Sequence, residues 1–392
     1  MTHNDSRVQT GLDVLLRVGH PTLNNARIGL VTNHTAVTRD LVSIVDALHG
    51  DSRFKLVKLF APEHGVRGAA QAGDHVDDEV DTVTGLPVVS LYGANRTPSE
   101  EQLSGLDAVI FDIQDAGARH YTYISTMVNV MQACAPLNLP YLVLDRPNPI
   151  TGLHAEGKVL EAEFTSFVGI HPMPTRHGLT MGELALMIAS ELGSPTPTVI
   201  ACEGWNRGMW WDITGLPFVN PSPNLPTPKS LMVYTATCIL EATTLSEGRG
   251  TTLPFETVGA PWVDGNALAT ALNSRNLPGV IFRATGFTPS FSKHQGELCG
   301  GVQLHITDRD AFRPVSTGVH IVHALRNLAN SQFEWTSGPA LGMSHGRLYG
   351  STELREMIDA GTSAEEIIAT WQPELYAFSE RARSYHMYKG EG

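Results

Sequence analysis

A carboxylic acid and an imidazole follow directly after an apolar run in residues 59–68. Glu63 and His64 stand between a proline and a glycine there, as expected where a buried strand stops at a tight turn. Ligands of parallel-sheet proteins bind at the carboxyl ends of strands, so Glu63 is a candidate general acid and His64 a candidate binding residue. The alternative is a structural carboxylate that accepts hydrogen bonds from the turn amides of Gly65 and Val66.

A second group of polar side chains lies in residues 111–123, after another apolar run. These residues suit a cradle for a sugar or a carboxylate, because acids accept hydrogen bonds from hydroxyls, tyrosine rings stack on sugar faces, and arginine binds an anion through two hydrogen bonds. An internal Asp–Arg pair that braces a loop explains the same pattern, and both interpretations stay open. The candidates in this segment are Asp112, Gln114, Asp115, Arg119, Tyr121 and Tyr123.

Polar residues also follow the other apolar runs. Residues 145–149 place an acid, an arginine and an asparagine on a turn fixed by two prolines. We prefer a structural ion pair for that turn from its residues alone. A basic pair further on could bind an anion, and helix capping suits it equally well. The candidates from these segments are Asn33, Asp145, Arg146, Asn148, Arg176 and His177.

Alternating strands and helices must position these side chains. Apolar runs without alternation predict strands buried on both faces, and apolar residues at helical spacing lie between several of them. The carboxyl ends of five such strands would lie along one edge of a mostly parallel sheet and converge on one crevice. The expected strands are 27–33, 55–60, 87–92, 107–113, 140–145 and 197–202, and the expected helices are 41–49, 98–104, 122–135 and 180–192.

The pattern changes after about residue 205. Residues 219–228 contain four prolines and predict a stiff, extended connector. We therefore expect an α/β catalytic domain over residues 1–220 and an α+β domain over residues 221–392. The second domain should contain strands 279–284 and 300–306 with helices 231–241, 316–329, 351–359 and 364–371.

Composition excludes several classes of function. The 392 residues carry a net charge of −13, which argues against nucleic acid as a partner because its phosphates attract clustered cations.

Four widely spaced cysteines predict buried thiols in a reducing compartment. The polar start of the chain and the absence of an apolar run of about 18 residues predict a cytoplasmic protein, with a trimmed exported protein as the competing explanation. No standard nucleotide or metal motif occurs, so no cofactor or metal is expected.

Six segments, residues 59–68, 111–123, 144–152, 220–228, 241–252 and 287–302, together resemble the exo-β-N-acetylmuramidase family of the NamZ type. The resemblance implies a Rossmann-like N-terminal domain without a nucleotide and a C-terminal domain that closes a cleft over it. It also implies hydrolysis of terminal N-acetylmuramic acid (MurNAc) from the non-reducing end of peptidoglycan fragments. The family's proposed catalytic glutamate falls on Glu63.

The implied substrate makes further demands on the site. A second carboxylate, for which Asp112 and Asp115 are candidates, would act as base or nucleophile, or an Asp would orient the substrate's own acetamido group. The lactyl carboxylate of MurNAc calls for a cation, and Arg119, Arg146, Arg176 and Arg249 are the candidates. Two other functions stay open: a muropeptide-binding protein without activity, and a metal-dependent amidase that uses His64. The residues do not indicate an oligomeric state.

Overall fold

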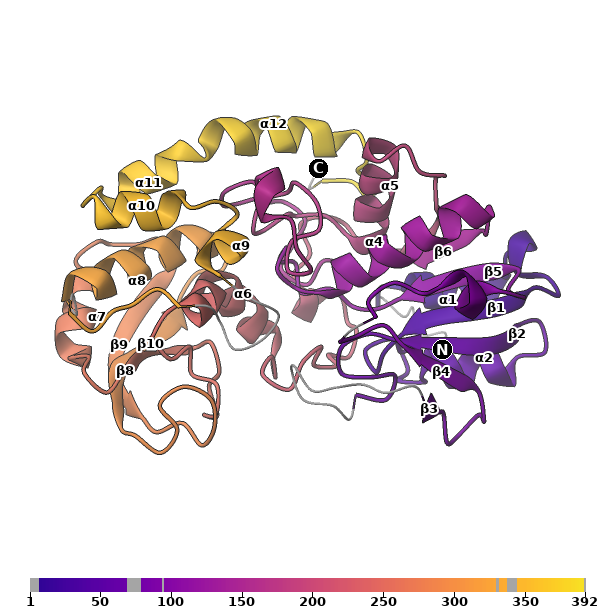
Figure 1. Ribbon diagram of the computed structural model, residues 1–392, viewed down its shortest axis with the longest axis horizontal. Coiled ribbons are helices and arrows are strands. Elements are labelled where there is room, and N and C mark those ends of the chain that lie inside the picture. Colours follow the sequence, from indigo (N-terminus) through magenta and orange to yellow (C-terminus); the bar gives the residue numbers. More distant parts are fainter. Residues whose placement is uncertain (1–6, 69–78, 94, 329–330, 337–343, 391–392) are drawn as a thin grey trace, which may run out of the picture.

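The computed structural model of the chain describes residues 7–68, 79–93, 95–328, 331–336 and 344–390. Within them, a seven-stranded sheet is formed by the first half of the chain and a three-stranded sheet by the second, with helices around both (Figure 1). The strand orders are β3-β4-β2-β1-β5-β6-β7 and β8-β10-β9. The strands of the large sheet are β1 (Arg27–Thr32), β2 (Lys55–Ala61), β3 (Glu79–Val80), β4 (Pro87–Ser90), β5 (Ala108–Asp112), β6 (Tyr141–Leu144) and β7 (Thr198–Ile200).

The large sheet is parallel except at one edge, where β3 pairs antiparallel with β4. The chain winds outward in both directions from β1 and β5, whose paired ends bring Thr32 beside Asp112. Such a reversal of strand order leaves a crevice at the carboxyl ends, which is where this architecture binds ligands. The expected mostly parallel sheet is confirmed.

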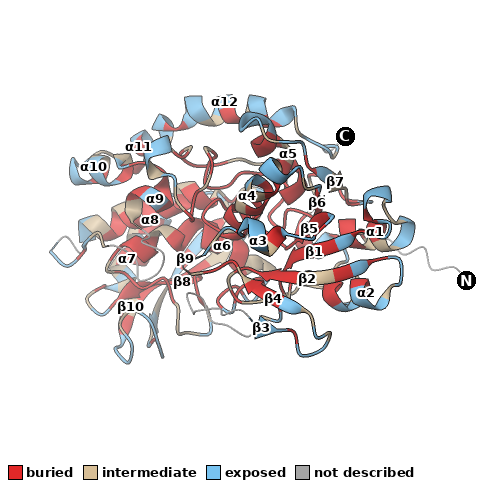
Figure 2. Ribbon diagram, turned by 45° about the vertical axis from the view of Figure 1, so that its right-hand side comes forward, coloured by how far each residue is buried: buried red, intermediate tan, exposed pale blue. Residues whose placement is uncertain are grey.

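Both faces of this sheet are buried, as its apolar strands predicted. Leu30 and Ile110 pack in the cluster that contains residues of α1 and α2, whereas Val31 and Phe111 pack in the cluster that contains residues of α4 and α5. Figure 2 shows buried residues both in the strands and in helices such as α4 and α5. A capping box of Thr180 and Glu183 opens α5. The helices of this half are α1 (Gly11–Val18), α2 (Ile44–Gly50), α3 (Glu100–Leu103), α4 (Tyr123–Cys134) and α5 (Met181–Glu191).

The second half forms an antiparallel sheet with helices, in agreement with the expected α+β class. The proline-rich connector runs without regular structure until Pro228, which occupies the first turn of α6. The strands here are β8 (Thr257–Ala260), β9 (Val280–Phe287) and β10 (Cys299–Ile306). The helices are α6 (Pro228–Thr237), α7 (Gly265–Asn273), α8 (Pro314–Leu328), α9 (His345–Tyr349), α10 (Glu353–Asp359), α11 (Ala364–Thr370) and α12 (Gln372–Arg383).

One hydrophobic core joins the two halves. Met127 of α4, Leu231 of α6 and Val319 of α8 belong to the same buried cluster. Helix α12 crosses above both halves and brings the end of the chain beside α5 (Figure 1). The Tyr388 hydroxyl then donates to Asp145 Oδ2 at 2.6 Å. The halves are therefore joined by packing and by the returning C-terminal segment as well as by the connector.

The four cysteines are unbridged and buried, as expected. No helix within the described residues is long and apolar enough to cross a membrane. Those residues also contain no group of three or more His, Cys, Asp or Glu side chains that could hold a metal ion.

Candidate active site

Glu63 lies on a strained turn at the carboxyl end of β2. The Gly65 amide donates to the Pro62 carbonyl at 3.0 Å, which closes a turn of four residues. His64 occupies the third position with φ of 73°, a left-handed conformation that costs a non-glycine residue about 1–2 kcal/mol. Strain of this kind is concentrated at functional sites. The Gly65 amide therefore bonds to the Pro62 carbonyl, whereas the structural alternative had it donate to the Glu63 carboxylate.

Two hydroxyl groups from neighbouring elements hold the Glu63 carboxyl. The Tyr92 hydroxyl donates to Oε1 at 3.0 Å and the Thr122 hydroxyl donates to Oε2 at 2.8 Å. Tyr92 follows β4, and Thr122 stands directly before α4, where its hydroxyl makes no helix-capping bond. Thr122 therefore gives up the usual stabilising role of a threonine at that position. The carboxyl itself is half-buried.

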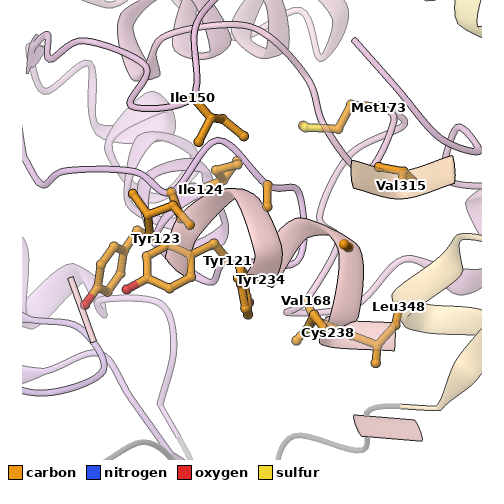
Figure 3. Close-up of a cluster of buried hydrophobic side chains, with 14 of the residues drawn as sticks. Tyr121, Tyr123, Ile124, Ile150, Val168, Met173, Tyr234, Cys238, Val315 and Leu348 are labelled. Atoms are coloured by element: carbon orange, nitrogen blue, oxygen red, sulfur yellow. The ribbon is translucent and has the colours of Figure 1, made fainter. Parts of the chain in front are cut away.

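Two tyrosines beside this carboxyl bind the connector. The hydroxyls of Tyr121 and Tyr123 both donate to the Pro221 carbonyl, at 2.7 and 3.0 Å. Their rings meet edge to face with centroids 4.8 Å apart, and Figure 3 shows both hydroxyls on the same side of the cluster. Burial raises the pKa of Tyr123, and the nearby Glu63 carboxylate raises it further. Both rings therefore serve as neutral donors.

His34 binds the same connector from β1. Its Nε2 lies 2.8 Å from the Asn220 carbonyl, so this nitrogen carries the proton. Burial lowers the pKa of His34 and the neighbouring His64 lowers it further, whereas the hydrogen bond to Asn220 acts in the opposite direction. With Tyr121 and Tyr123, this bond fixes the connector against the edge of the large sheet that carries Glu63.

Asp115, in the loop between β5 and α4, forms a pair with His177, which lies shortly before α5. The Leu179 amide donates to His177 Nδ1, so Nε2 carries the proton and donates to Asp115 Oδ2 at 3.2 Å. The Gly117 amide donates to the same oxygen at 2.6 Å. Asp115 Oδ1 is buried and has no hydrogen-bond partner within the described part of the chain. Such an oxygen is an available acceptor for a ligand or a water.

Asn33 and Gln114 each contribute one further open polar atom. Asn33 Oδ1 accepts from the Thr35 amide and hydroxyl, while its Nδ2 is buried and unpartnered among the described residues. Gln114 donates to the carbonyls of Asp115 and Pro147, and its Oε1 is buried without a hydrogen-bond partner among the described residues. These two side chains lie on the ends of β1 and β5, as predicted.

Asp112 and Arg146 neutralise each other in the interior. Arg146 donates from Nε to Asp112 Oδ1 and from Nη2 to Oδ2, the latter at 2.9 Å. The side chains are 0% and 4% exposed. Burial raises the pKa of Asp112, although the Arg146 charge acts in the opposite direction. The internal Asp–Arg pair considered for this region is therefore present, but it joins β5 to the turn after β6.

Asp145 and Asn148 brace the turn after β6. Asp145 accepts from the Gly182 amide, the Thr180 hydroxyl and the Tyr388 hydroxyl. Burial raises its pKa to about 6. Asn148 donates to the Leu179 carbonyl at 2.8 Å. These contacts link the large sheet to α5 and to the end of the chain.

Three predicted arginines are bound inside the protein. Arg119 is 1% exposed and donates to the carbonyls of Lys158, Met173 and Leu348. Arg176 donates to the Ile150 carbonyl. Arg249 donates to Glu241 Oε1 from both Nε and Nη2, at 2.9 and 2.6 Å. Burial lowers the pKa of Arg119 to about 9 and that of Arg176 to about 10.

The structure thus divides the predicted residues into two groups. Around the Glu63 turn lie His64, Tyr121 and Tyr123, and the open polar atoms of Asn33, Gln114 and Asp115 lie on neighbouring strand ends. Internal contacts occupy Asp112, Arg119, Asp145, Arg146, Asn148, Arg176 and Arg249. Tyr92 and Thr122, which touch Glu63, were not among the predicted residues. Their position directly after a strand and within residues 111–123 was the signal that could have found them.

Known proteins resemble this chain over nearly its full length. The N-terminal and C-terminal profiles described as exo-beta-N-acetylmuramidase NamZ match residues 28–229 and 232–388. The peptidoglycan beta-N-acetylmuramidase NamZ of Bacillus subtilis (strain 168) is 48% identical over 388 residues, which cover 99% of this chain and 93% of that protein.

Two solved structures share the fold. A DUF1343 family protein from Bacteroides fragilis NCTC 9343 is 37% identical with a TM-score of 0.89, over 98% of this chain and 99% of that one. A second DUF1343 family protein from the same organism is 33% identical with a TM-score of 0.79, over the same shares. On the strength of both profiles and of these relatives, the chain belongs to the exo-β-N-acetylmuramidase NamZ family.

Proposed function

We propose that this protein releases MurNAc from the non-reducing end of peptidoglycan fragments, with Glu63 as the general acid. Membership of the family carries the reaction class. The single observation that carries the assignment of Glu63 is its position on a strained turn at the sheet edge, with its two carboxyl oxygens held by the hydroxyls of Tyr92 and Thr122. The proton would go to the glycosidic oxygen as the bond to the sugar breaks.

The two hydroxyls suit a group that must exchange a proton. A hydroxyl can donate to a carboxylate, and after rotation it can accept from a protonated carboxyl. Tyr92 and Thr122 can therefore hold Glu63 in the same place before and after proton transfer. A guanidinium in their position could only donate, and it would favour the charged form alone.

Asp115 is the better candidate for the second catalytic group. Its Oδ1 is open, whereas both oxygens of Asp112 are bonded to Arg146. His177 holds Asp115 Oδ2 and leaves Oδ1 for the substrate or for a water. Asp115 would act as base or nucleophile, or would orient the substrate's acetamido group.

Product analysis with a MurNAc-terminated disaccharide tests the proposal. We expect free MurNAc to accumulate with the wild-type protein, and activity to persist after treatment with a chelator. Tight binding of the disaccharide without release of a sugar would indicate a binding protein without catalytic activity. Loss of activity on chelation, restored by added metal, would favour the metal-dependent alternative.

We further propose that the protein acts in the cytoplasm on imported fragments. The four free, buried cysteines support a reducing compartment. Fractionation of the producing cells tests this, since the native protein should be recovered with cytoplasmic markers, and recovery outside the cell membrane would contradict it.

A further inference from the structure

We propose that Arg96 binds the lactyl carboxylate of MurNAc and so selects that sugar, an inference that rests on the proposed function. Arg96 lies between β4 and α3 and was not among the arginines that the sequence suggested. Those four arginines are held by internal carbonyls or carboxylates, so they offer an anion little. Arg146 and Arg249 are paired with carboxylates, and Arg119 and Arg176 are only 1% exposed. Arg96 differs from all four because it is half-buried and no ion pair joins it to a carboxylate of the described residues.

One donor of the Arg96 guanidinium is unsatisfied where it lies. Its Nε is buried and has no hydrogen-bond partner within the described part of the chain. Its Cζ stands 4.4 Å from the centroid of the Phe167 ring, a cation–π contact that orients the group without using its N–H donors. An arginine placed in this way presents its planar donors to an incoming carboxylate.

Phe167 connects this guanidinium to the Glu63 turn. Its ring packs against the Tyr92 ring with centroids 6.4 Å apart, and Tyr92 donates to Glu63. Phe167 and Tyr92 also share a buried cluster with Val66, three residues beyond Glu63. An apolar wall therefore runs from the carboxyl to the guanidinium.

Helix α4 aligns the components of this arrangement. Thr122 donates to Glu63, Ser125 donates to the Phe167 carbonyl at 2.7 Å, and Asn129 donates to the Arg96 carbonyl at 3.1 Å. Positions 122, 125 and 129 follow the i, i+3, i+7 spacing of one helix face. Seven residues of helix span about 10 Å. The same face thus holds the acid at one end and the backbone of the cation at the other, with an aromatic ring between them.

The chemistry of the sugar matches this order of groups. MurNAc carries its lactyl arm on the same ring as the glycosidic carbon, so one residue must meet the acid and the cation together. A carboxylate that pairs with Arg96 would orient the glycosidic oxygen towards Glu63. N-acetylglucosamine has no such arm and would gain nothing from the guanidinium.

Kinetics on a chromogenic MurNAc glycoside test this assignment. Arg96→Gln should raise KM about 10- to 100-fold and change kcat little, because the lost contact is a charge-assisted pair remote from the broken bond. Arg96→Lys should have a KM between those of the wild type and Arg96→Gln, since it keeps the charge and loses the planar donors. Equal KM values for Arg96→Gln and wild type would overturn the inference.

Arg53→Gln is the matched control. Arg53 also stands over a phenylalanine ring, with Cζ 5.3 Å from the Phe54 centroid, but it precedes β2 and so lies at the opposite end of the strand that carries Glu63. Its replacement should leave KM unchanged. Thermal unfolding of all variants shows whether a change in KM comes from lost structure.

Calorimetry separates this inference from the proposed function. Wild-type protein should bind MurNAc more tightly than its lactyl amide by the same factor, and Arg96→Gln should bind both alike. If wild type cleaves no glycoside yet prefers the acid through Arg96, the proposed function fails and the inference stands. If wild type does not distinguish the acid from the amide, the inference is wrong.

Discussion

Two carboxyl groups at the same edge of the large sheet are treated in opposite ways. Asp112 at the end of β5 is fully buried and paired with a guanidinium, whereas Glu63 at the end of β2 is half-buried and held by hydroxyls. The ion pair with Arg146 occupies both carboxyl oxygens of Asp112 and leaves neither for a substrate. Hydroxyl partners fix a position without fixing a protonation state. The partner of an acid, more than its place in the fold, therefore indicates its task.

Glu63→Gln should have the largest effect. The amide cannot supply a proton, so we expect kcat for the MurNAc glycoside to fall by about 10²- to 10⁴-fold with little change in the temperature of unfolding. Steady-state kinetics and calorimetric melting measure the two quantities. A variant with near-normal kcat would break the comparison, because Glu63 would then be as structural as Asp112.

Arg146→Met should act on stability instead. It leaves Asp112 charged and unpaired in the interior, which typically costs about 3–5 kcal/mol of unfolding free energy. Denaturant titration measures this, and the double variant Asp112→Leu with Arg146→Met should recover part of the loss. If the Arg146→Met protein is as stable as the wild type and has a raised KM, Arg146 contacts the substrate, as the sequence suggested.

Lowering the pH should reduce the free energy of unfolding, because His120 is buried in the folded protein. Burial lowers the pKa of His120 to about 3, well below the 6.5 expected in the unfolded chain. As pH falls from 6.5 towards 3, the unfolded state binds a proton that the folded state does not, so stability falls by up to about 1.4 kcal/mol per pH unit. His120→Gln should flatten this slope in unfolding curves measured from pH 7 to pH 4, and an unchanged slope would contradict the assignment.

Thr122→Val should have the smallest of these effects. The change keeps the shape and removes the hydroxyl that holds Glu63 Oε2, so we expect kcat to fall about 10-fold. Because the hydroxyl makes no capping bond, the temperature of unfolding should stay near that of the wild type. Thr122→Ser restores the donor and should recover most of the activity. A loss of stability without a loss of kcat would assign Thr122 to the structural side of the comparison.

The sequence was sufficient for the scaffold. Residues 108–111 are apolar at every position, which predicts a strand buried on both faces, and β5 is such a strand. Thr180 and Glu183 predicted the start of α5 through local capping alone. Helix α12 was missed because its mean hydropathy is low and only Phe378 and Ala382 are buried on it. Its position depends on contacts with distant parts of the chain.

The site was less predictable because partners decide function. Asp112, Asp115 and Asp145 look alike in the sequence, yet they meet a guanidinium, a neutral imidazole and the hydroxyl of Tyr388. Those partners come from up to 243 residues away. Residue type and strand position located the edge of the sheet correctly, whereas the division of labour among the acids depends on tertiary structure.

The return of the C-terminal segment has a consequence for how the chain is made. Asp145 is buried, and the Tyr388 hydroxyl that binds it belongs to a residue translated 243 positions later. The Cys202 amide donates to that same hydroxyl at 2.9 Å, so residues after two neighbouring strands both form a hydrogen bond with the Tyr388 side chain. These hydrogen bonds beyond the ends of β6 and β7 therefore form only after Tyr388 has been made, although the strands are translated first.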